Sequence, residues 1–368
     1  MINKFLLLFL LGFVGLMGYI KYNHSVKIKD LDFVYQQLCD NHPGFYNEQD
    51  FGFKNILQQG YNEARSKILE LYWWQNHIVI LKKYLEKFND SHLRIYQDNV
   101  TFKTIINNEI NHNISVELFS NKDLIVHLPT FMLNEKQEKQ FKTVIDEISK
   151  LDDLRNIVFD LRYNSGGNSE LGTQILKAVF GKDYVEQQLY ELYQNQTVWW
   201  RASKGNSNYL YELVSYFSKN KELYKDVLSR LAEIAKGVSQ SLKDNKIFFI
   251  EKESNYKKSL QKISCPIRAK IIVVIDKTNV SAALDFITEL KALSKHITFI
   301  GHKTDADTIY MEVRTILLPS KYGTLQFPIK MYHNRPRKNN QNYSPDIICP
   351  TKNINDEWIL SHACSNSK

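Results

Sequence analysis

The chain has 368 residues, of which 43% are hydrophobic and 12% aromatic, and this composition excludes an intrinsically disordered protein. A single hydrophobic core stops growing at about 250 to 300 residues, so the chain is expected to divide into more than one domain. The formal net charge is +8, but 48 basic residues are scattered among 40 acidic ones, and this mixture predicts no nucleic-acid partner.

The N-terminal segment, residues 1–22, predicts an export signal or a signal anchor. Lys4 precedes an uncharged apolar run over residues 5–20, and polar residues follow from Lys21 onward. The run is somewhat short for the roughly 20 residues that span a bilayer, but no Ala-x-Ala cleavage pattern follows it. We therefore expect a retained membrane anchor and an exported chain in the cell envelope, periplasmic or extracellular. A buried first helix is the alternative, although such a helix would normally carry a polar stripe.

The four cysteines fit an oxidising compartment and form no metal-binding pattern. Cys349 and Cys364 are close enough in sequence to pair across a C-terminal loop, while reduced, buried thiols fit equally well. The sequence therefore predicts no metal site and leaves the redox state of the thiols open.

Residues 23–90 predict a small helical domain. Apolar side chains recur there at spacings of three and four residues, as Leu31, Val34 and Leu38 do, and this spacing is typical of a helix with one buried face. The dipeptide at residues 43–44, Pro-Gly, separates the first two helices.

Residues 91–368 predict an α/β core, because short apolar strands alternate with helical stretches. The expected strands are residues 92–96, 115–119, 124–128, 157–160 and 271–275, and the core continues through residues 297–301, 311–319 and 325–328. Between about 182 and 264 the alternation lapses into a mostly helical segment, which predicts an insertion. Its aromatic residues could line a substrate groove, or they could pack the insertion on the core.

Two short segments carry most of the functional signal, and each follows an apolar strand. Residues 160–167 turn through Gly166 and Gly167, whose missing Cβ atoms let backbone N–H groups crowd a bound oxygen. Residues 278–286 deliver Ser281 to the start of a helix, where free N–H groups favour developing negative charge. Each segment has a plainer interpretation when taken alone. The two glycines could form an ordinary turn, and the serine could be the N-cap of a helix. Together, in this order, they predict a serine nucleophile beside an oxyanion pocket.

A serine hydroxyl needs a neighbouring base to take its proton, and His92 is the best-placed candidate. It follows a polar corner at residues 90–91 and opens the first predicted strand of the core, where its side chain can face a cleft. The alternative is a surface histidine or a satisfied core histidine.

These segments resemble the serine peptidases of the C-terminal processing and tricorn-core type, which share a crotonase-like fold of ββα units. The resemblance runs in the family's order over most of the chain after residue 25. It covers residues 90–92, 160–167, 276–286, 301–304, 312–314 and 318–346.

The resemblance implies roles for the residues of the two motifs. Ser281 corresponds to the nucleophile, and His92, with Ser91 beside it, corresponds to the base of the tricorn type. The Gly166 and Gly167 turn and the N–H of Ala282 correspond to the oxyanion hole.

The chain also departs from the family pattern. The processing proteases use a lysine where this sequence has Asp307, so a serine and lysine dyad is not expected, and Lys303 falls at a different place in the motif. The orienting glutamate of the tricorn type aligns with Asn339, and Asp346 is a substitute candidate.

The sequence therefore predicts an exported serine peptidase that cleaves peptide or protein substrates without a metal or organic cofactor. The alternative is a catalytically inactive homologue that binds peptides or apolar ligands in the same cleft, which the uncharged Asn339 favours. Labelling of Ser281 by a fluorophosphonate distinguishes the two.

Overall fold

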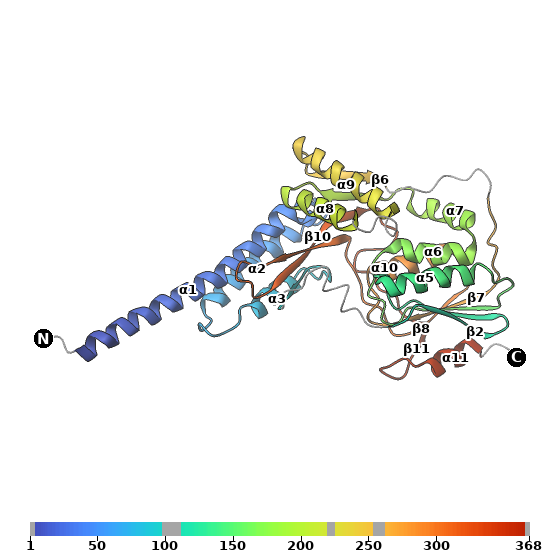
Figure 1. The fold of residues 1–368 in the computed structure, drawn as a ribbon, viewed down its shortest axis with the longest axis horizontal. Helices are drawn as coiled ribbons and strands as arrows, with labels where there is room; N and C mark the ends of the chain where they lie inside the picture. Colours follow the sequence, from blue (N-terminus) through green and yellow to red (C-terminus); the bar gives the residue numbers. More distant parts are fainter. Residues whose placement is uncertain (1–3, 98–111, 219–224, 253–261, 365–368) are drawn as a thin grey trace. The chain divides into compact units, whose positions relative to one another are not determined.

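The computed structural model describes residues 4–97, 112–218, 225–252 and 262–364. The chain forms two compact units, each built from separate segments (Figure 1). The first unit contains residues 1–102, 198–251 and 310–331, and the second contains residues 103–197, 252–309 and 332–368.

The first unit begins with the helices expected from the apolar spacing. They are α1 (Lys4–Asn41), the 3-10 helix η1 (Pro43–Tyr46), α2 (Phe53–Leu69) and α3 (Ile78–Glu86). The three side chains that defined the spacing, Leu31, Val34 and Leu38, are fully buried. The pattern of the sequence therefore marks the face of α1 that packs in the unit.

The predicted anchor forms the first turns of α1, which begins at Lys4. The side chains of residues 1–21 lie outside the described part of the structure. Among the helices whose side chains are described, none is both long and apolar enough to cross a bilayer. Membrane anchoring by residues 1–22 thus stays a prediction.

A five-stranded sheet completes the first unit. Its order is β1-β10-β5-β6, and β9 pairs with β10 in antiparallel register. The bounds are β1 (Arg94–Tyr96), β5 (Thr197–Arg201), β6 (Phe248–Lys252), β9 (Tyr310–Leu317) and β10 (Thr324–His333).

The segment predicted as a helical insertion contains two strands of this sheet. Besides α7 (Lys182–Tyr193), α8 (Lys204–Phe217) and α9 (Lys225–Lys243), it supplies β5 and β6. Burial alternates along β5, with Val198 and Trp200 inside, so the neighbouring Trp199 and Trp200 point to opposite faces of a strand.

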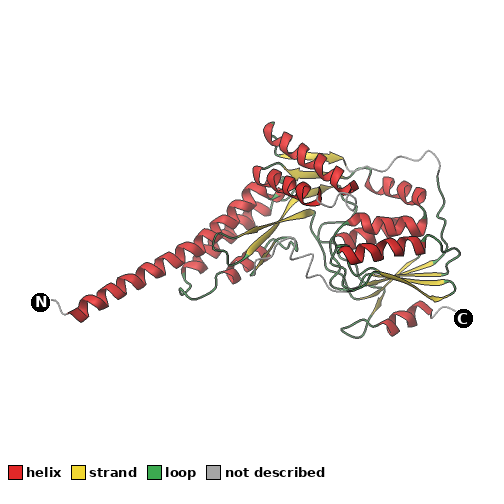
Figure 2. Ribbon diagram, in the orientation of Figure 1, coloured by secondary structure: helices red, strands yellow, loops and turns green. Residues whose placement is uncertain are grey.

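The second unit contains a six-stranded sheet of order β11-β8-β7-β4-β3-β2 (Figure 2). The neighbours from β11 to β3 pair in parallel, and β2 pairs with β3 in antiparallel register. The bounds are β2 (Ser115–Ser120), β3 (Asp123–His127), β4 (Asn156–Asp160), β7 (Lys270–Ile275), β8 (Ile297–Gly301) and β11 (Ile347–Ile348). The predicted α/β class is confirmed.

Helices cover both faces of this sheet. On one face, Phe159 and Val273 pack with side chains of α5 (Glu135–Ile148), α6 (Ser169–Phe180), α7 and α10 (Ala282–Leu293). On the other face, Val158 and Val274 pack with Ile359 of α11 (Asp356–Cys364). Because both faces are buried, these strands appear as continuous apolar runs in the sequence.

The predicted domains, 23–90 and 91–368, were drawn as continuous stretches. The compact units instead join segments that are distant in sequence, because β9 and β10 pair in one sheet with β1. The predicted boundaries describe a different division and stay a prediction.

A buried histidine lies among the aromatic side chains of the first unit. His42 caps η1, and its Nδ1 accepts a hydrogen bond from the N–H of Gly44 at 3.0 Å. Its ring stacks on Phe53 and meets the ring of Tyr310 at an edge, with centroid distances of 4.7 and 5.0 Å. Burial lowers the pKa of His42 to about 4, although the charge of Asp90 acts in the opposite direction.

We expect His42 to make the first unit less stable in mild acid. The unfolded chain binds a proton near pH 6.5 and the folded chain only near pH 4, so acid between these values favours unfolding. At pH 5 this linkage costs about 2 kcal/mol. In His42→Asn, whose amide can still accept from Gly44, the drop in Tm from pH 7 to pH 5 should be smaller. Circular dichroism measures it, with exposed His296→Asn as control, and an unchanged drop would contradict the assignment.

Candidate active site

Two adjacent parallel strands bring the glycine turn and the Ser281 loop to one edge of the second unit's sheet. β4 and β7 pair in parallel, with Asp160 opposite Val274 near their carboxyl ends. The N–H of Leu161 donates to the carbonyl of Val274 at 3.0 Å, which extends this pairing into the first turn. The loops that follow β4 and β7 therefore start side by side, at the edge where α/β proteins place their sites.

Ser281 occupies a strained turn between β7 and α10. Its backbone angles are φ 58° and ψ −123°, a combination that residues with a Cβ atom rarely adopt. Ser281 is the N-cap residue of α10, but its side chain makes no capping hydrogen bond to that helix, unlike an ordinary serine N-cap. A strained serine between a strand and a helix is the geometry that presents a nucleophilic hydroxyl.

Gly166 lies directly against Ser281. A Cβ atom added to Gly166 would stand 2.9 Å from the Cβ of Ser281, 2.9 Å from the carbonyl oxygen of Val280 and 3.1 Å from the nitrogen of Ala282. Its φ of 101° also favours glycine. Both the space and the backbone conformation therefore require glycine at this position.

The N–H groups of the two glycines have different partners. The N–H of Gly166 donates to Oδ1 of Asn164 at 2.9 Å, which leaves it unavailable to a substrate. The N–H groups of Gly167 and Ala282 have no hydrogen-bond partner among the described residues. Of the three residues predicted to form an oxyanion hole, Gly167 and Ala282 thus offer free N–H donors. Gly166 instead allows the glycine turn to lie close to the Ser281 loop.

A buried carboxylate fixes the backbone of the Ser281 turn. Asp307 is fully buried, and its Oδ2 accepts a hydrogen bond from the N–H of Ser281 at 3.1 Å. The same carboxylate pairs with Arg337 at 2.7 Å and with Arg335 at 3.0 Å. These contacts give Asp307 a structural role in anchoring the serine loop, and its correspondence with the lysine of the processing proteases stays a prediction. The nearby Lys303 is exposed.

The same arginine joins the loop to the first turn of α10. Arg337 Nη1 donates to Oδ1 of Asp285 at 2.8 Å, and the hydroxyl of Ser169 donates to the other oxygen of Asp285 at 2.8 Å. Burial acts to raise the pKa of Asp285, but the charge of Arg337 and these hydrogen bonds hold it below its usual value. Asp285 therefore stays ionised and ties α10 to α6.

Two residues predicted to support the base make local backbone contacts. Oδ1 of Asn339 accepts a hydrogen bond from the N–H of Ile309 at 2.8 Å. Oδ2 of Asp346 accepts from the N–H of Phe299 in β8 at 2.8 Å, just before β11 begins. These contacts give both side chains a structural role, and their role toward a base stays a prediction.

His92 lies in the first unit, in a turn before β1, so β1 begins at Arg94, two residues later than expected. The N–H of His92 donates to Oδ1 of Asp90 at 2.9 Å, and the same oxygen lies 3.6 Å from Nδ1 of the imidazole. The side chain of His92 is 13% exposed, while that of Asp90 is 3% exposed. Its backbone is held to β10, because Gln326 donates to its carbonyl oxygen at 3.2 Å.

Asp90 is a candidate that sequence reasoning missed. Its Oδ2 and the Nδ1 of His92 have no hydrogen-bond partner among the described residues, so this carboxylate can accept from the imidazole after a small rotation. The signal was present in the sequence, because an aspartate two residues before a histidine readily turns back on it.

A second histidine and carboxylate pair belongs to the second unit but lies away from α10. Nδ1 of His127 is 2.9 Å from Asp160, which Arg162 also contacts. Arg162 in turn contacts Asp356 of α11. His127 and Asp160 follow the two-residue alternation of the face that α11 covers, whereas α10 packs on the opposite face.

The second unit thus brings together Ser281, Ala282, Gly166 and Gly167. The predicted base His92 and its neighbour Ser91 belong to the first unit, beside Asp90. The pairing of His92 with Ser281 joins residues of the two units and stays a prediction.

The comparisons with known proteins identify a family and a shared fold. The model of peptidase family S41 matches residues 124–349, a range that holds the glycine turn, Ser281 and Asp307. Mature CPAF complexed with lactacystin is 11% identical over 89% of this chain and 94% of that chain, with a TM-score of 0.53. This likeness shows a shared fold.

Two further solved structures are more distant. The photosystem II D1 C-terminal processing protease is 10% identical over 93% of this chain and 96% of that chain, with a TM-score of 0.40. A lipoprotein from Streptococcus agalactiae is 10% identical over 88% and 92% of the two chains, with a TM-score of 0.45. No curated protein matches the sequence. The family match confirms the resemblance drawn from the motifs.

The contact between Gly166 and Ser281 predicts a selective effect of a methyl group. Gly166→Ala places a Cβ against the Cβ of Ser281, whereas Gly181→Ala meets nothing within 4 Å at a similarly positive φ of 79°. Both variants carry backbone strain of about 1 to 3 kcal/mol, because a positive φ disfavours a residue with a Cβ atom. Gly166→Ala should lose about 1 to 3 kcal/mol more, because the crowded turn must shift. Thermal denaturation measures the difference, and equal losses would contradict the packing described.

Proposed function

The chain belongs to peptidase family S41 and is a serine-type peptidase, and on that premise we propose that Ser281 is its nucleophile and His92 its general base. The strained backbone of Ser281, set against Gly166 and the free N–H groups of Gly167 and Ala282, is the observation that carries the proposal. Peptides or proteins are the substrates.

In the proposed reaction, His92 takes the proton of the Ser281 hydroxyl as the oxygen attacks a peptide carbonyl. The carbonyl oxygen becomes negatively charged and accepts hydrogen bonds from the N–H groups of Gly167 and Ala282. One such donor typically contributes about 3 to 4 kcal/mol to the transition state. The imidazolium then protonates the leaving amine, and water releases the acyl group by the same steps in reverse.

We further propose that Asp90, and not Asn339, orients the base. An ionised carboxylate beside Nδ1 favours the tautomer whose Nε2 can accept a proton, and it stabilises the imidazolium that forms. Asp90 offers an oxygen 3.6 Å from Nδ1 within the same unit. The amide of Asn339 is uncharged and already accepts from Ile309.

Three other parts of the proposal come from the sequence. The peptidase core has the ββα units of the crotonase-like fold. The chain is exported to the cell envelope, and residues 1–22 anchor it there. The uncharged apolar run over residues 5–20, which follows Lys4, supports this location.

A fluorophosphonate probe tests the nucleophile and the base. Its phosphorus bonds to an activated serine oxygen as fluoride leaves, so the chain should be labelled on Ser281. Labelling should disappear in Ser281→Ala and fall about 10³-fold or more in His92→Ala, because a serine without its base reacts poorly. Mass spectrometry of the labelled peptide measures both.

The exposed Lys303 is the control for this test. Lys303→Ala should keep the labelling rate, and loss of labelling in that variant would transfer the role of base to lysine. An unlabelled wild-type chain would favour the inactive homologue.

The orienting role of Asp90 has its own test. Asp90→Asn should lower the labelling rate by about 10² to 10⁴-fold, because the imidazolium loses its counter-charge. Asn339→Ala, the matched control, should leave the rate unchanged. Thermal denaturation of both variants checks that they remain folded. A lower labelling rate in Asn339→Ala with an unchanged rate in Asp90→Asn would contradict the assignment.

A further inference from the structure

The loop between α2 and α3 exposes three neighbouring aromatic rings. Tyr72, Trp73 and Trp74 are 62%, 37% and 64% exposed. We call these three residues the aromatic loop. Leu69 and Val79, at the two ends of the connection, are also more than half exposed, at 53% and 52%. The catalytic proposal makes no use of this surface.

The aromatic loop is ordered and holds its rings in one cluster. Tyr72 and Trp74 stack with centroids 4.8 Å apart and planes at 3°, and Trp73 meets Trp74 edge to face at 5.4 Å. The N–H of Tyr72 donates to the side chain of Gln75 at 2.7 Å, which closes the turn. The exposed rings therefore form a single apolar surface on a defined turn.

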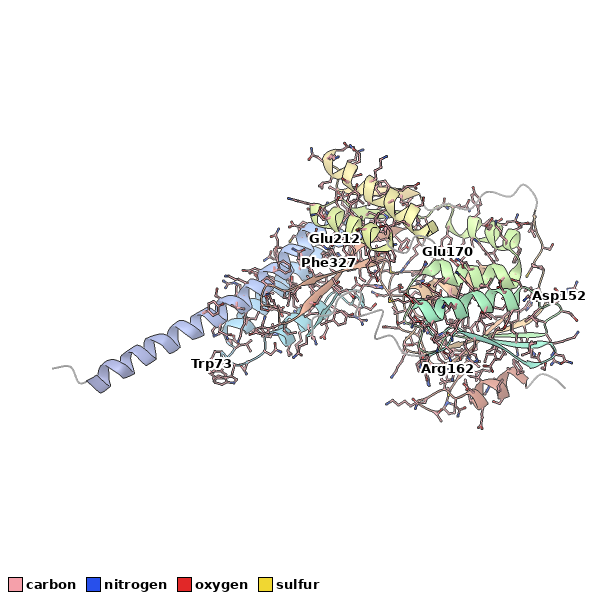
Figure 3. All side chains as sticks on the ribbon, in the orientation of Figure 1. Trp73, Asp152, Arg162, Glu170, Glu212 and Phe327 are labelled. Carbon is pink, nitrogen blue, oxygen red and sulfur yellow. The ribbon has the colours of Figure 1, made fainter. Side chains whose placement is uncertain are left out.

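A buried lysine ties the aromatic loop to α1. Nζ of Lys27 donates to the carbonyl oxygens of Tyr72 and Trp73 at 3.0 and 3.2 Å, and Lys27 is only 4% exposed. Burial lowers the pKa of Lys27. The contact sets the position of the loop along the helix, and Figure 3 shows Trp73 on the side of the first unit from which the N-terminal part of α1 extends.

That position lies a short distance along the helix beyond the end of the apolar run. Lys27 comes seven residues after residue 20, where the run ends, which is about 10 Å along a helix. A span of about 20 residues that starts at Phe5 ends at His24, about 5 Å before Lys27. The polar interface of a bilayer is about 5 to 8 Å deep on each side. The loop is thus held at the height of that interface if residues 5–20 enter a membrane.

We propose that the aromatic loop is a second membrane contact, which inserts its tyrosine and tryptophans among lipid headgroups beside the N-terminal anchor. Tryptophan and tyrosine are the side chains that concentrate at this depth, because each combines an apolar ring with a polar group. The inference rests on the proposed anchoring by residues 1–22. Two contacts on one side of the first unit restrict its tilt on the membrane, which a single helix cannot do.

Tryptophan fluorescence of the full chain in vesicles tests the inference. The vesicles contain phosphatidylcholine and phosphatidylglycerol, with bromine atoms placed either high or low on the acyl chains. The wild-type emission should shift to the blue and be quenched more strongly by the high bromines. In Trp73→Phe/Trp74→Phe this quenched component should be lost. In Trp199→Phe, the matched control, it should remain, because Trp199 packs on Phe248 in the sheet.

Flotation of the same vesicles separates this inference from the proposals on which it rests. Chains that float with the vesicles but show equal quenching in the wild type and the double variant would overturn the aromatic contact and leave the anchor in place. Chains that do not float would overturn both. Fluorophosphonate labelling in detergent reports on the peptidase proposal independently of either result.

Discussion

The hydrogen bond from the N–H of Ser281 to the buried carboxylate of Asp307 is the interaction on which the candidate site depends. It holds the serine in a backbone conformation that is unfavourable on its own. A buried carboxylate is itself costly, and Arg335 and Arg337 neutralise it. Arg337 also binds Asp285, so one charge network fixes both the turn and the first turn of the helix behind it.

This network gives a physical reason for the departure from the processing proteases. A lysine at position 307 could serve as a base, but it could not accept the N–H of Ser281 or neutralise two arginines. With Asp307 there, we propose that the proton acceptor comes from elsewhere in the chain. The first unit offers His92 with a buried carboxylate beside it. The charge of Asp307 is thus consistent with the proposed pair of Ser281 and His92.

Much of the fold and part of the site could be predicted because they depend on local patterns. Apolar runs marked the parallel strands, since β4 and β7 are buried on both faces. The tight turn after β4 followed from the glycines at 166 and 167. Burial of α1 followed from spacings of three and four residues. By contrast, β5 and β6 were not predicted within a segment that appeared helical, because β5 pairs with β10 across distant parts of the chain and β6 pairs with β5.

The sequence by itself determined the residue types, their order and the family, because strand, turn and helix signals are encoded within a few neighbouring residues. Only the tertiary structure decided which N–H groups of the described site have a partner. It showed that the N–H of Gly166 donates to Asn164 and that the carboxylate of Asp307 accepts from the N–H of Ser281. These facts depend on side chains far apart in sequence meeting at a few ångströms, and periodicity carries no information about such distances. The same holds for Lys27, whose contact with the aromatic loop joins residues 45 positions apart.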